Sequence, residues 1–168
     1  MAGLVKRPPA SLKGGLLDQE HFQICHCTND LERACAVFAD RFGIEEWRRL
    51  EGDLPSGGYI RIAIAWAGGV MYELLTASGP GTDFYMDRLP KDDFAMRLHH
   101  LGYLVHDQAG WDAMKAEVTR GGWRISQEND TVGFMRHCYV DAPELGHYLE
   151  YIFPEAAGIA FFEAVPAH

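Results

Sequence analysis

The chain has 168 residues, 48% of them hydrophobic, and a formal net charge of −9 at pH 7. This length and composition suit one structural domain with a hydrophobic core. The acidic charge argues against a nucleic-acid or anionic-membrane surface, because both need a basic footprint. The sequence has no apolar run near the ~20 residues that span a bilayer and no secretory signal in residues 1–17. We therefore expect a cytoplasmic protein.

The first half of the chain predicts a β-α-β-β-β order after a flexible arm. Asn29, with Glu32 three residues later, indicates a capping box at the start of a helix over residues 30–42. Gly43 is a typical C-terminal stop for that helix. From alternating apolar residues and turn signals, the strands are expected at residues 21–27, 46–50, 59–66 and 70–76.

The second half predicts the same order. A helix is expected to follow Asp107 and to end at Gly121-Gly122. A further short helix is expected over residues 156–165. The strands of this half are expected at residues 98–105, 123–127, 133–140 and 147–153.

Polar landmarks recur along the chain with one constant spacing. The pairs, each 77 positions apart, are Gln23 and His100, Asp30 and Asp107, and Glu73 and Glu150. An equal spacing shared by independent landmarks indicates an internal repeat. The repeat also makes Asp30 and Asp107 equivalent helix caps rather than catalytic residues.

The repeat predicts the organisation of the chain. We expect two similar modules that close around one site within one structural domain. The segments are an arm at residues 1–19, a first βαβββ module at 20–80, a connector at 81–97, a second βαβββ module at 98–154 and a tail at 155–168.

Four polar residues hold equivalent strand positions in the two halves. Gln23 and His100 lie in the first strands, and Glu73 and Glu150 in the last, so two curled sheets would bring all four to one point. Buried carboxylates are costly unless they are paired or bound to metal. Two carboxylates, an imidazole and an amide oxygen suit one divalent ion: Mn²⁺, Mg²⁺, Co²⁺, Ni²⁺ or Zn²⁺. Alternatively, Glu73 or Glu150 pairs with Arg61 or a histidine across the sheet.

Other polar residues are expected to have mainly structural roles. His26 is predicted to pack on the strand face opposite Gln23, and His99 to point away from His100. Without any CxxC pair, the cysteines are predicted to be reduced, buried and apolar in character, at Cys25, Cys27, Cys35 and Cys138. The candidates for substrate contact are Arg61, for an anionic group, and Tyr72 and Tyr148, as pocket walls.

Four segments resemble the vicinal oxygen chelate superfamily, which includes glyoxalase I, methylmalonyl-CoA epimerase, extradiol dioxygenases and bleomycin-resistance proteins. The segments are Gln23 to Gly43, Met71-Tyr72-Glu73-Leu74-Leu75, His99-His100-Leu101-Gly102 with Asp107, and His147-Tyr148-Leu149-Glu150. The resemblance covers about residues 20–154. It implies an α+β fold in which two paired βαβββ modules form a cupped, partly closed mixed sheet with helices outside.

The resemblance also implies one divalent metal ion between the modules. It carries the metal positions onto Gln23, Glu73, His100 and Glu150. Gln23 departs from the family, which usually has histidine there. His21, two residues earlier on the same strand face, is a possible substitute.

Within the superfamily, residues 71–76 followed by a spacer and the His99-His100-Leu101-Gly102 strand are most similar to the glyoxalase and epimerase branch. This implies an isomerase, epimerase or lyase that removes a proton next to a carbonyl of a small organic or thioester substrate. The metal would stabilise an enolate, and Glu73 or Glu150 would be the base.

Two other functions compete with this one. A metal-free protein of the bleomycin-resistance type would sequester a small molecule, and Gln23 favours it. A ring-cleaving dioxygenase fits less well, because it needs two histidines and one carboxylate. In each case the partner is a small molecule. We also expect a homodimer, because apolar outer sheet faces and Phe161-Phe162 leave apolar surface to cover.

Overall fold

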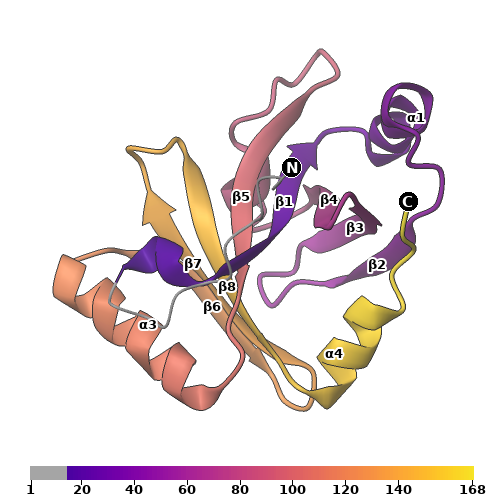
Figure 1. The fold of residues 1–168 in the computed structure, drawn as a ribbon. Helices are drawn as coiled ribbons and strands as arrows, with labels where there is room; N and C mark the ends of the chain where they lie inside the picture. The colour runs from indigo at the N-terminus through magenta and orange to yellow at the C-terminus, as the bar shows by residue number, and fades with distance from the viewer. Residues whose placement is uncertain (1–14) are drawn as a thin grey trace, which may run out of the picture. The chain divides into compact units, whose positions relative to one another are not determined.

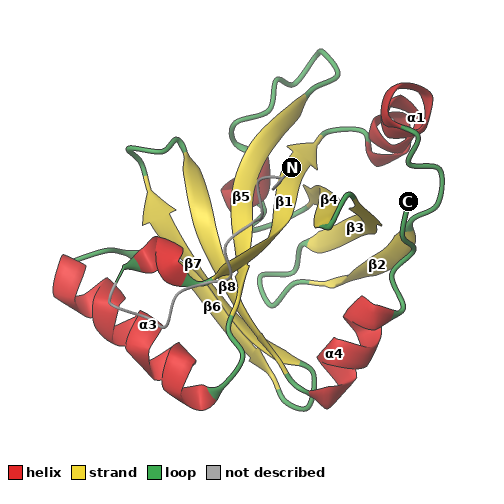
Figure 2. Cartoon of the chain, viewed as in Figure 1, coloured by secondary structure: helices red, strands yellow, loops and turns green. Residues whose placement is uncertain are grey.

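The computed structural model describes residues 15–168, so most of the predicted arm at residues 1–19 lies outside the described residues. The described part holds four α-helices, one short 3-10 helix and eight strands (Figures 1 and 2). In chain order they are η1 (Leu16–Asp18), β1 (Glu20–Thr28), α1 (Leu31–Phe42), β2 (Arg48–Asp53), β3 (Tyr59–Ala67), β4 (Val70–Ser78), α2 (Asp83–Met86), β5 (Met96–Leu104), α3 (Gln108–Gly121), β6 (Ile125–Thr131), β7 (Met135–Ala142), β8 (His147–Pro154) and α4 (Ala156–Glu163).

The described chain divides into two compact units. The first unit consists of Phe22–Leu101 and Ala160–His168, and the second unit consists of the described residues up to His21 and of Gly102–Ile159. The two cuts fall inside β1 and β5, so each of these strands passes from one unit into the other.

Strand order in the first unit is β2-β3-β4-β1-β5. Strands β2, β3 and β4 pair antiparallel, as expected for strands joined by short turns. Strand β1 pairs parallel with β4, in a register that sets Gln23 opposite Met71 and Cys25 opposite Glu73. This parallel pairing joins chain segments about 50 residues apart.

Different helices cover the two faces of the first unit's sheet. The apolar residues of α1 recur with a helical period, as in an amphipathic helix, and pack against Ala63, Ala65 and Leu74. On the opposite face, Tyr85 of α2 packs with Cys25 and other buried residues of β1 and β4. We call these the α1 face and the α2 face. Neighbouring residues of β4 therefore point to different environments.

The second unit packs α3 against the antiparallel strands β6, β7 and β8. Trp111 of α3 lies 6.4 Å from the ring of Phe153, and Arg136 lies over that same ring at 4.5 Å. Tyr103 stacks on Tyr151 at 5.6 Å. These contacts give this unit its own aromatic core.

The predicted repeat is confirmed by the element starts. The starts that differ by 77 positions are those of α1 and α3 (Leu31, Gln108), β2 and β6 (Arg48, Ile125), and β4 and β8 (Val70, His147). The predicted α+β fold class, with two βαβββ modules, is therefore confirmed. The finer division into five segments stays a prediction.

The caps of α1 and α3 confirm one prediction and correct another. Asp30 accepts a hydrogen bond from the Arg33 amide at 3.0 Å, and Asp107 accepts one from the Gly110 amide at 2.7 Å. Asn29 is not the cap, because the helix begins one residue later than the capping box implied. Its side chain instead bonds to the connector, as donor to the carbonyls of Pro90 and Asp93 and as acceptor from the Ala95 amide.

Replacing either capping aspartate by alanine should lower the free energy of unfolding by about 1 kcal/mol, because one amide at the helix start loses its acceptor. Urea unfolding of Asp30→Ala and Asp107→Ala measures this. Asparagine at the same position is the control and should retain most of the stability. Loss of activity with an unchanged melting temperature would contradict the purely structural role.

The predicted C-terminal helix is α4, and its two phenylalanines pack within the first unit. Phe162 contacts Phe22 at 5.9 Å and accepts a hydrogen bond from Trp66 Nε1 at 3.3 Å. Arg48 lies over the ring of Phe161 at 4.5 Å. These two phenylalanines thus have partners in their own chain, and the predicted homodimer needs other apolar surface. The homodimer and the cytoplasmic location stay predictions.

Among the helices of residues 15–168, none has both the length and the apolar character needed to cross a membrane.

Candidate metal centre

Three adjacent strands of the first unit bring polar side chains together. On β4, Tyr72 and Leu74 belong to the α1 face, so Glu73 between them belongs to the α2 face. Cys25 lies opposite Glu73 in the parallel pair, and Gln23 lies two residues earlier on the same face. The strand on the other side of β1 is β5, which carries His100.

These side chains are almost completely removed from water. The exposed fraction is 2% for Gln23, 6% for Glu73, and 0% for both Cys25 and His100. A buried carboxylate is stabilised by donors or by a cation, because water no longer solvates its charge.

The contacts centre on the Glu73 carboxylate. Gln23 Nε2 donates a short hydrogen bond to Glu73 Oε2, and His100 Nε2 lies 3.8 Å from the same oxygen. The structure therefore brings together three of the four predicted metal residues. It also adds Cys25: single donor atoms of Cys25, Glu73 and His100 all lie within 4.8 Å of one another.

The sequence pattern did not mark Cys25 as a neighbour of the predicted metal residues. The prediction of a buried, reduced cysteine is confirmed for all four cysteines, which lie in the described part of the chain. What the sequence did not reveal is the neighbour of Cys25, because the parallel pairing of β1 with β4 links distant segments. The one available signal was its spacing of two residues from Gln23 on the same strand.

His99 joins the cluster through His100, so the prediction that it points away is wrong. The Nδ1 atoms of the two rings are 2.9 Å apart, and His99 Nε2 lies 3.0 Å from the Phe84 carbonyl oxygen. Strict alternation holds for regular strands, but here the two rings turn toward each other.

When both rings are neutral, these two contacts set their tautomers. A carbonyl oxygen only accepts, so His99 Nε2 must carry the proton that it donates to Phe84. His99 Nδ1 is then the acceptor, and His100 Nδ1 is the donor. The lone pair of His100 is left on Nε2, the nitrogen that faces Glu73. Metal-binding histidines are commonly oriented by such an outer hydrogen bond.

Replacing His99 by phenylalanine should weaken divalent-metal binding about 10–100-fold, because the ring stays but the acceptor for His100 Nδ1 is lost. Competition with a fluorescent chelator measures the affinity. His99→Gln is the matched rescue, since its amide oxygen restores an acceptor. Equal affinities of wild type and His99→Phe would rule out the orienting role.

The donor set fits a divalent ion. Glu73 offers a carboxylate, His100 a lone pair on Nε2 and Gln23 an amide. In the structure the amide presents N–H to Glu73, and a half-turn of that amide presents its oxygen instead. Carboxylate, amide and imidazole ligands together suit Mn²⁺, Mg²⁺, Co²⁺, Ni²⁺ or Zn²⁺.

Gln23→His should tighten the binding of a transition-metal ion by about tenfold or more, because imidazole is a better ligand than an amide for these metals. Zn²⁺ competition titrations against wild type measure the change. The matched control is Gln19→His, which introduces the same ring outside the cluster. Unchanged affinity would remove Gln23 from the proposed ligands.

Glu150 and two other predicted residues lie in the second unit. Glu150 is 5% exposed and sits on β8 opposite Tyr139 of β7. Tyr148 is half-buried and lies two residues before Glu150 on that strand. The ring of His21, the suggested substitute for Gln23, lies 5.4 Å from Tyr103. The share of Glu150 and Tyr148 in the site stays a proposal.

Arg61 and Tyr72 lie on the α1 face, away from Glu73. Arg61 pairs with Glu32 at 2.7 Å and with Glu51 at 3.8 Å, so the alternative in which Arg61 neutralises Glu73 is wrong. Tyr72 contacts Phe38 of α1 at 5.8 Å. Alternation along the strands explains both placements, since Tyr72 directly precedes Glu73.

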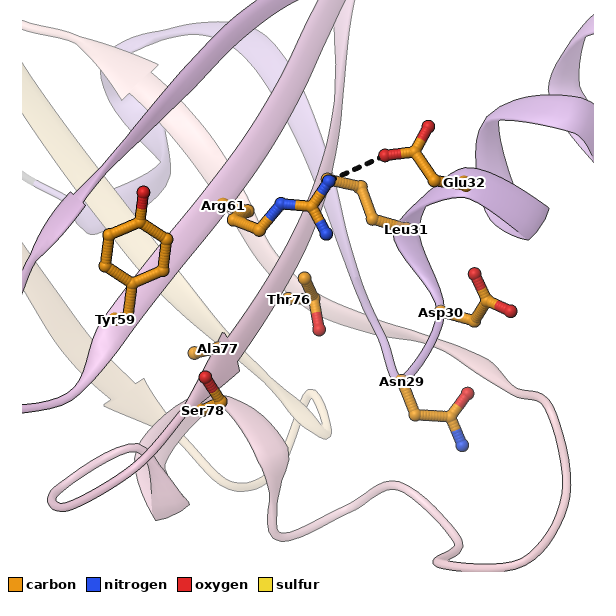
Figure 3. A pocket seen from close by; sticks show the side chains of 9 residues that line it. All are labelled: Asn29, Asp30, Leu31, Glu32, Tyr59, Arg61, Thr76, Ala77 and Ser78. Carbon is orange, nitrogen blue, oxygen red and sulfur yellow. Dashed lines mark hydrogen bonds and ion pairs between the residues drawn. The ribbon is translucent and has the colours of Figure 1, made fainter.

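A cavity of about 310 Å³ opens beside Arg61 on this α1 face. Figure 3 shows the guanidinium of Arg61 directed toward Glu32 at the start of α1. The lining residues are Asn29, Asp30, Leu31, Glu32, Tyr59, Arg61, Thr76, Ala77 and Ser78. Because Glu32 already neutralises Arg61, this cavity is a weak candidate for an anionic substrate group.

Comparison with known proteins identifies the fold. No protein-family model matches the chain, and no curated protein matches its sequence. Among solved structures, a methylmalonyl-CoA epimerase from Mycobacterium tuberculosis is 15% identical, with a TM-score of 0.59, over 89% of this chain and 97% of that one. A Streptomyces coelicolor methylmalonyl-CoA epimerase variant in complex with 2-nitronate-propionyl-CoA is 16% identical, with a TM-score of 0.58, over 83% and 96%.

A hypothetical protein from Bacillus halodurans C-125 matches equally well, with 17% identity and a TM-score of 0.59 over 82% of this chain and 95% of that one. At these identities the likeness establishes the fold alone. The fold predicted from the resemblance to the vicinal oxygen chelate superfamily is thereby confirmed.

Proposed function

We propose that the chain is a divalent-metal-dependent epimerase that moves a proton next to the carbonyl of a coenzyme A thioester. The observation that carries this proposal is the buried cluster of Gln23, Glu73 and His100 on adjacent strands. The shared fold supports the substrate class, since one of the matching epimerases was solved in complex with methylmalonyl-CoA and NH4+.

Glu73, His100 and Gln23 would hold the ion. A divalent ion supplies positive charge that favours the enolate form of a thioester. Residues of the chain would orient and stabilise the groups that hold the ion. His99 orients the His100 lone pair, and Gln23 steadies the Glu73 carboxylate.

Of the two candidate bases, we assign the proton transfer to Glu150. Glu73 Oε2 already accepts from Gln23 and lies near His100 Nε2, so moving it would disturb the ligands themselves. Glu150 would take the proton from the carbon next to the thioester carbonyl and leave a planar enolate. A water molecule would then give a proton to the opposite face, which makes the other epimer, and Glu150 would pass its proton to the hydroxide that remains. Burial of the cluster limits side reactions of the enolate with bulk water.

The test is hydrogen exchange at that carbon. The full chain, loaded with Co²⁺ or Zn²⁺, is mixed with methylmalonyl-CoA in D₂O, and proton NMR follows the loss of the hydrogen next to the carbonyl. We expect exchange well above the rate in buffer, and we expect EDTA treatment to abolish it.

Two results would overturn the proposal. Metal-loaded protein that exchanges no faster than buffer is not an epimerase for this class of substrate. Protein that takes up no divalent ion but still binds an acyl-CoA tightly is instead a sequestering protein, the alternative that Gln23 favoured.

A further inference from the structure

We propose that Cys25 is a ligand of this metal centre, and that its sulfur makes the centre select Zn²⁺ and Co²⁺ over Mg²⁺ and Mn²⁺. The proposal rests on the metal centre of the proposed function, but it assigns a residue that the superfamily resemblance does not. It also limits the five candidate ions to those that accept a thiolate.

The placement of Cys25 carries the inference. Its strand position is opposite Glu73 in the parallel pair, and its sulfur belongs to a group of donor atoms from Cys25, Glu73 and His100 within 4.8 Å of one another. Around a tetrahedral Zn²⁺ ion, with Zn–S near 2.3 Å and Zn–N near 2.0 Å, donor atoms are about 3.5 Å apart. Side-chain adjustments of about 1 Å therefore suffice to close the group on one ion.

Burial alone does not distinguish Cys25 from the other cysteines, since all four are buried. Cys27 lies two residues further on the same strand and packs in the same apolar cluster, yet it is not in the donor group. Burial raises the pKa of the Cys35 thiol and raises the pKa of Cys138 to about 12, which favours the neutral thiol at both positions. Among these cysteines, only Cys25 joins a carboxylate and an imidazole as a donor.

Binding of the ion by Cys25 releases one proton. The S–H bond of Cys25 breaks as the metal–sulfur bond forms, and the proton leaves to solvent, as metal binding to thiols generally requires. Mg²⁺ and Mn²⁺ prefer oxygen ligands, whereas thiolate favours Zn²⁺ and its neighbours in the transition series. One cysteine among oxygen and nitrogen donors thus shifts the selectivity of the whole site.

The experiment uses full-length protein loaded with Co²⁺. A thiolate bound to Co²⁺ gives an intense charge-transfer absorption in the near ultraviolet, which oxygen and nitrogen ligands do not give. We expect the band in wild type, its loss in Cys25→Ser and its retention in the matched control Cys27→Ser. The ratio of Zn²⁺ to Mg²⁺ affinity should fall by about tenfold or more in Cys25→Ser.

A measurement on wild type guards against a variant that fails to fold. X-ray absorption at the zinc edge should show one sulfur neighbour at about 2.3 Å. Only nitrogen and oxygen neighbours, or a band that survives in Cys25→Ser, would overturn the proposal. If metal-loaded protein exchanges the thioester proton without any sulfur signal, Cys25 is not a ligand but the proposed epimerase function stands. A sulfur signal without exchange would refute the epimerase alone.

Discussion

His100→Ala should abolish binding of the divalent ion. His100 is fully buried, and its Nε2 lone pair faces Glu73 from 3.8 Å, so no neighbouring water can replace it without opening the core. Wild type dialysed against Zn²⁺ should retain one ion per chain, and the variant none, as measured by plasma emission spectrometry.

The control for this variant is His26→Ala. His26 lies on the same strand as Gln23, but its ring is 6.5 Å from that of Phe38, on the α1 face. Burial lowers the pKa of His26, which favours the neutral ring of a packing residue. His100→Ala also creates a cavity and should cost roughly 2–5 kcal/mol of stability. If folded His100→Ala retains the metal, this cluster is not the metal centre.

Glu150→Gln should reduce proton exchange about 10²–10⁴-fold, while the metal content and the melting temperature change little. The amide keeps the shape of the side chain and can still offer an oxygen, but it cannot accept the proton. Glu73→Gln should instead lose the ion, because it removes the charge at the centre of the cluster. NMR exchange rates and metal analysis of the same samples separate these two effects.

The matched control is Glu144→Gln, in the exposed turn before β8. It makes the same chemical change in the same unit and should leave exchange unaltered. If Glu150→Gln exchanges at the wild-type rate while Glu73→Gln keeps its ion and loses exchange, the two roles are reversed. If neither variant is impaired, neither carboxylate is the base.

The constant 77-residue spacing made most of the fold predictable from sequence. Hydrophobic periodicity is local, so it located both helices and their strands. The repeat then related the modules and marked Gln23, Glu73, His100 and Glu150 as a group before any pairing was known. The first three of these meet in the structure. Alternation along the strand also predicts the face on which Tyr72 lies, because adjacent residues such as Tyr72 and Glu73 point to opposite faces.

What the sequence could not show depends on distant contacts. Cys25 meets Glu73 only because β1 pairs parallel with β4, and local hydrophobic periodicity does not determine that pairing. His99 contacts His100 through ring orientation, which strand alternation does not describe. Asn29 does not cap α1, because its side chain donates hydrogen bonds to the carbonyls of Pro90 and Asp93 in the connector.

The parallel pairing of β1 with β4 also has a consequence for folding kinetics. Gln23, Glu73 and His100 lie far apart in the chain, so they meet only after long loops have closed, which is slow and late in assembly. An ion that needs all three cannot speed the early steps. The free energy of ion binding should therefore lower the unfolding rate and leave the folding rate almost unchanged.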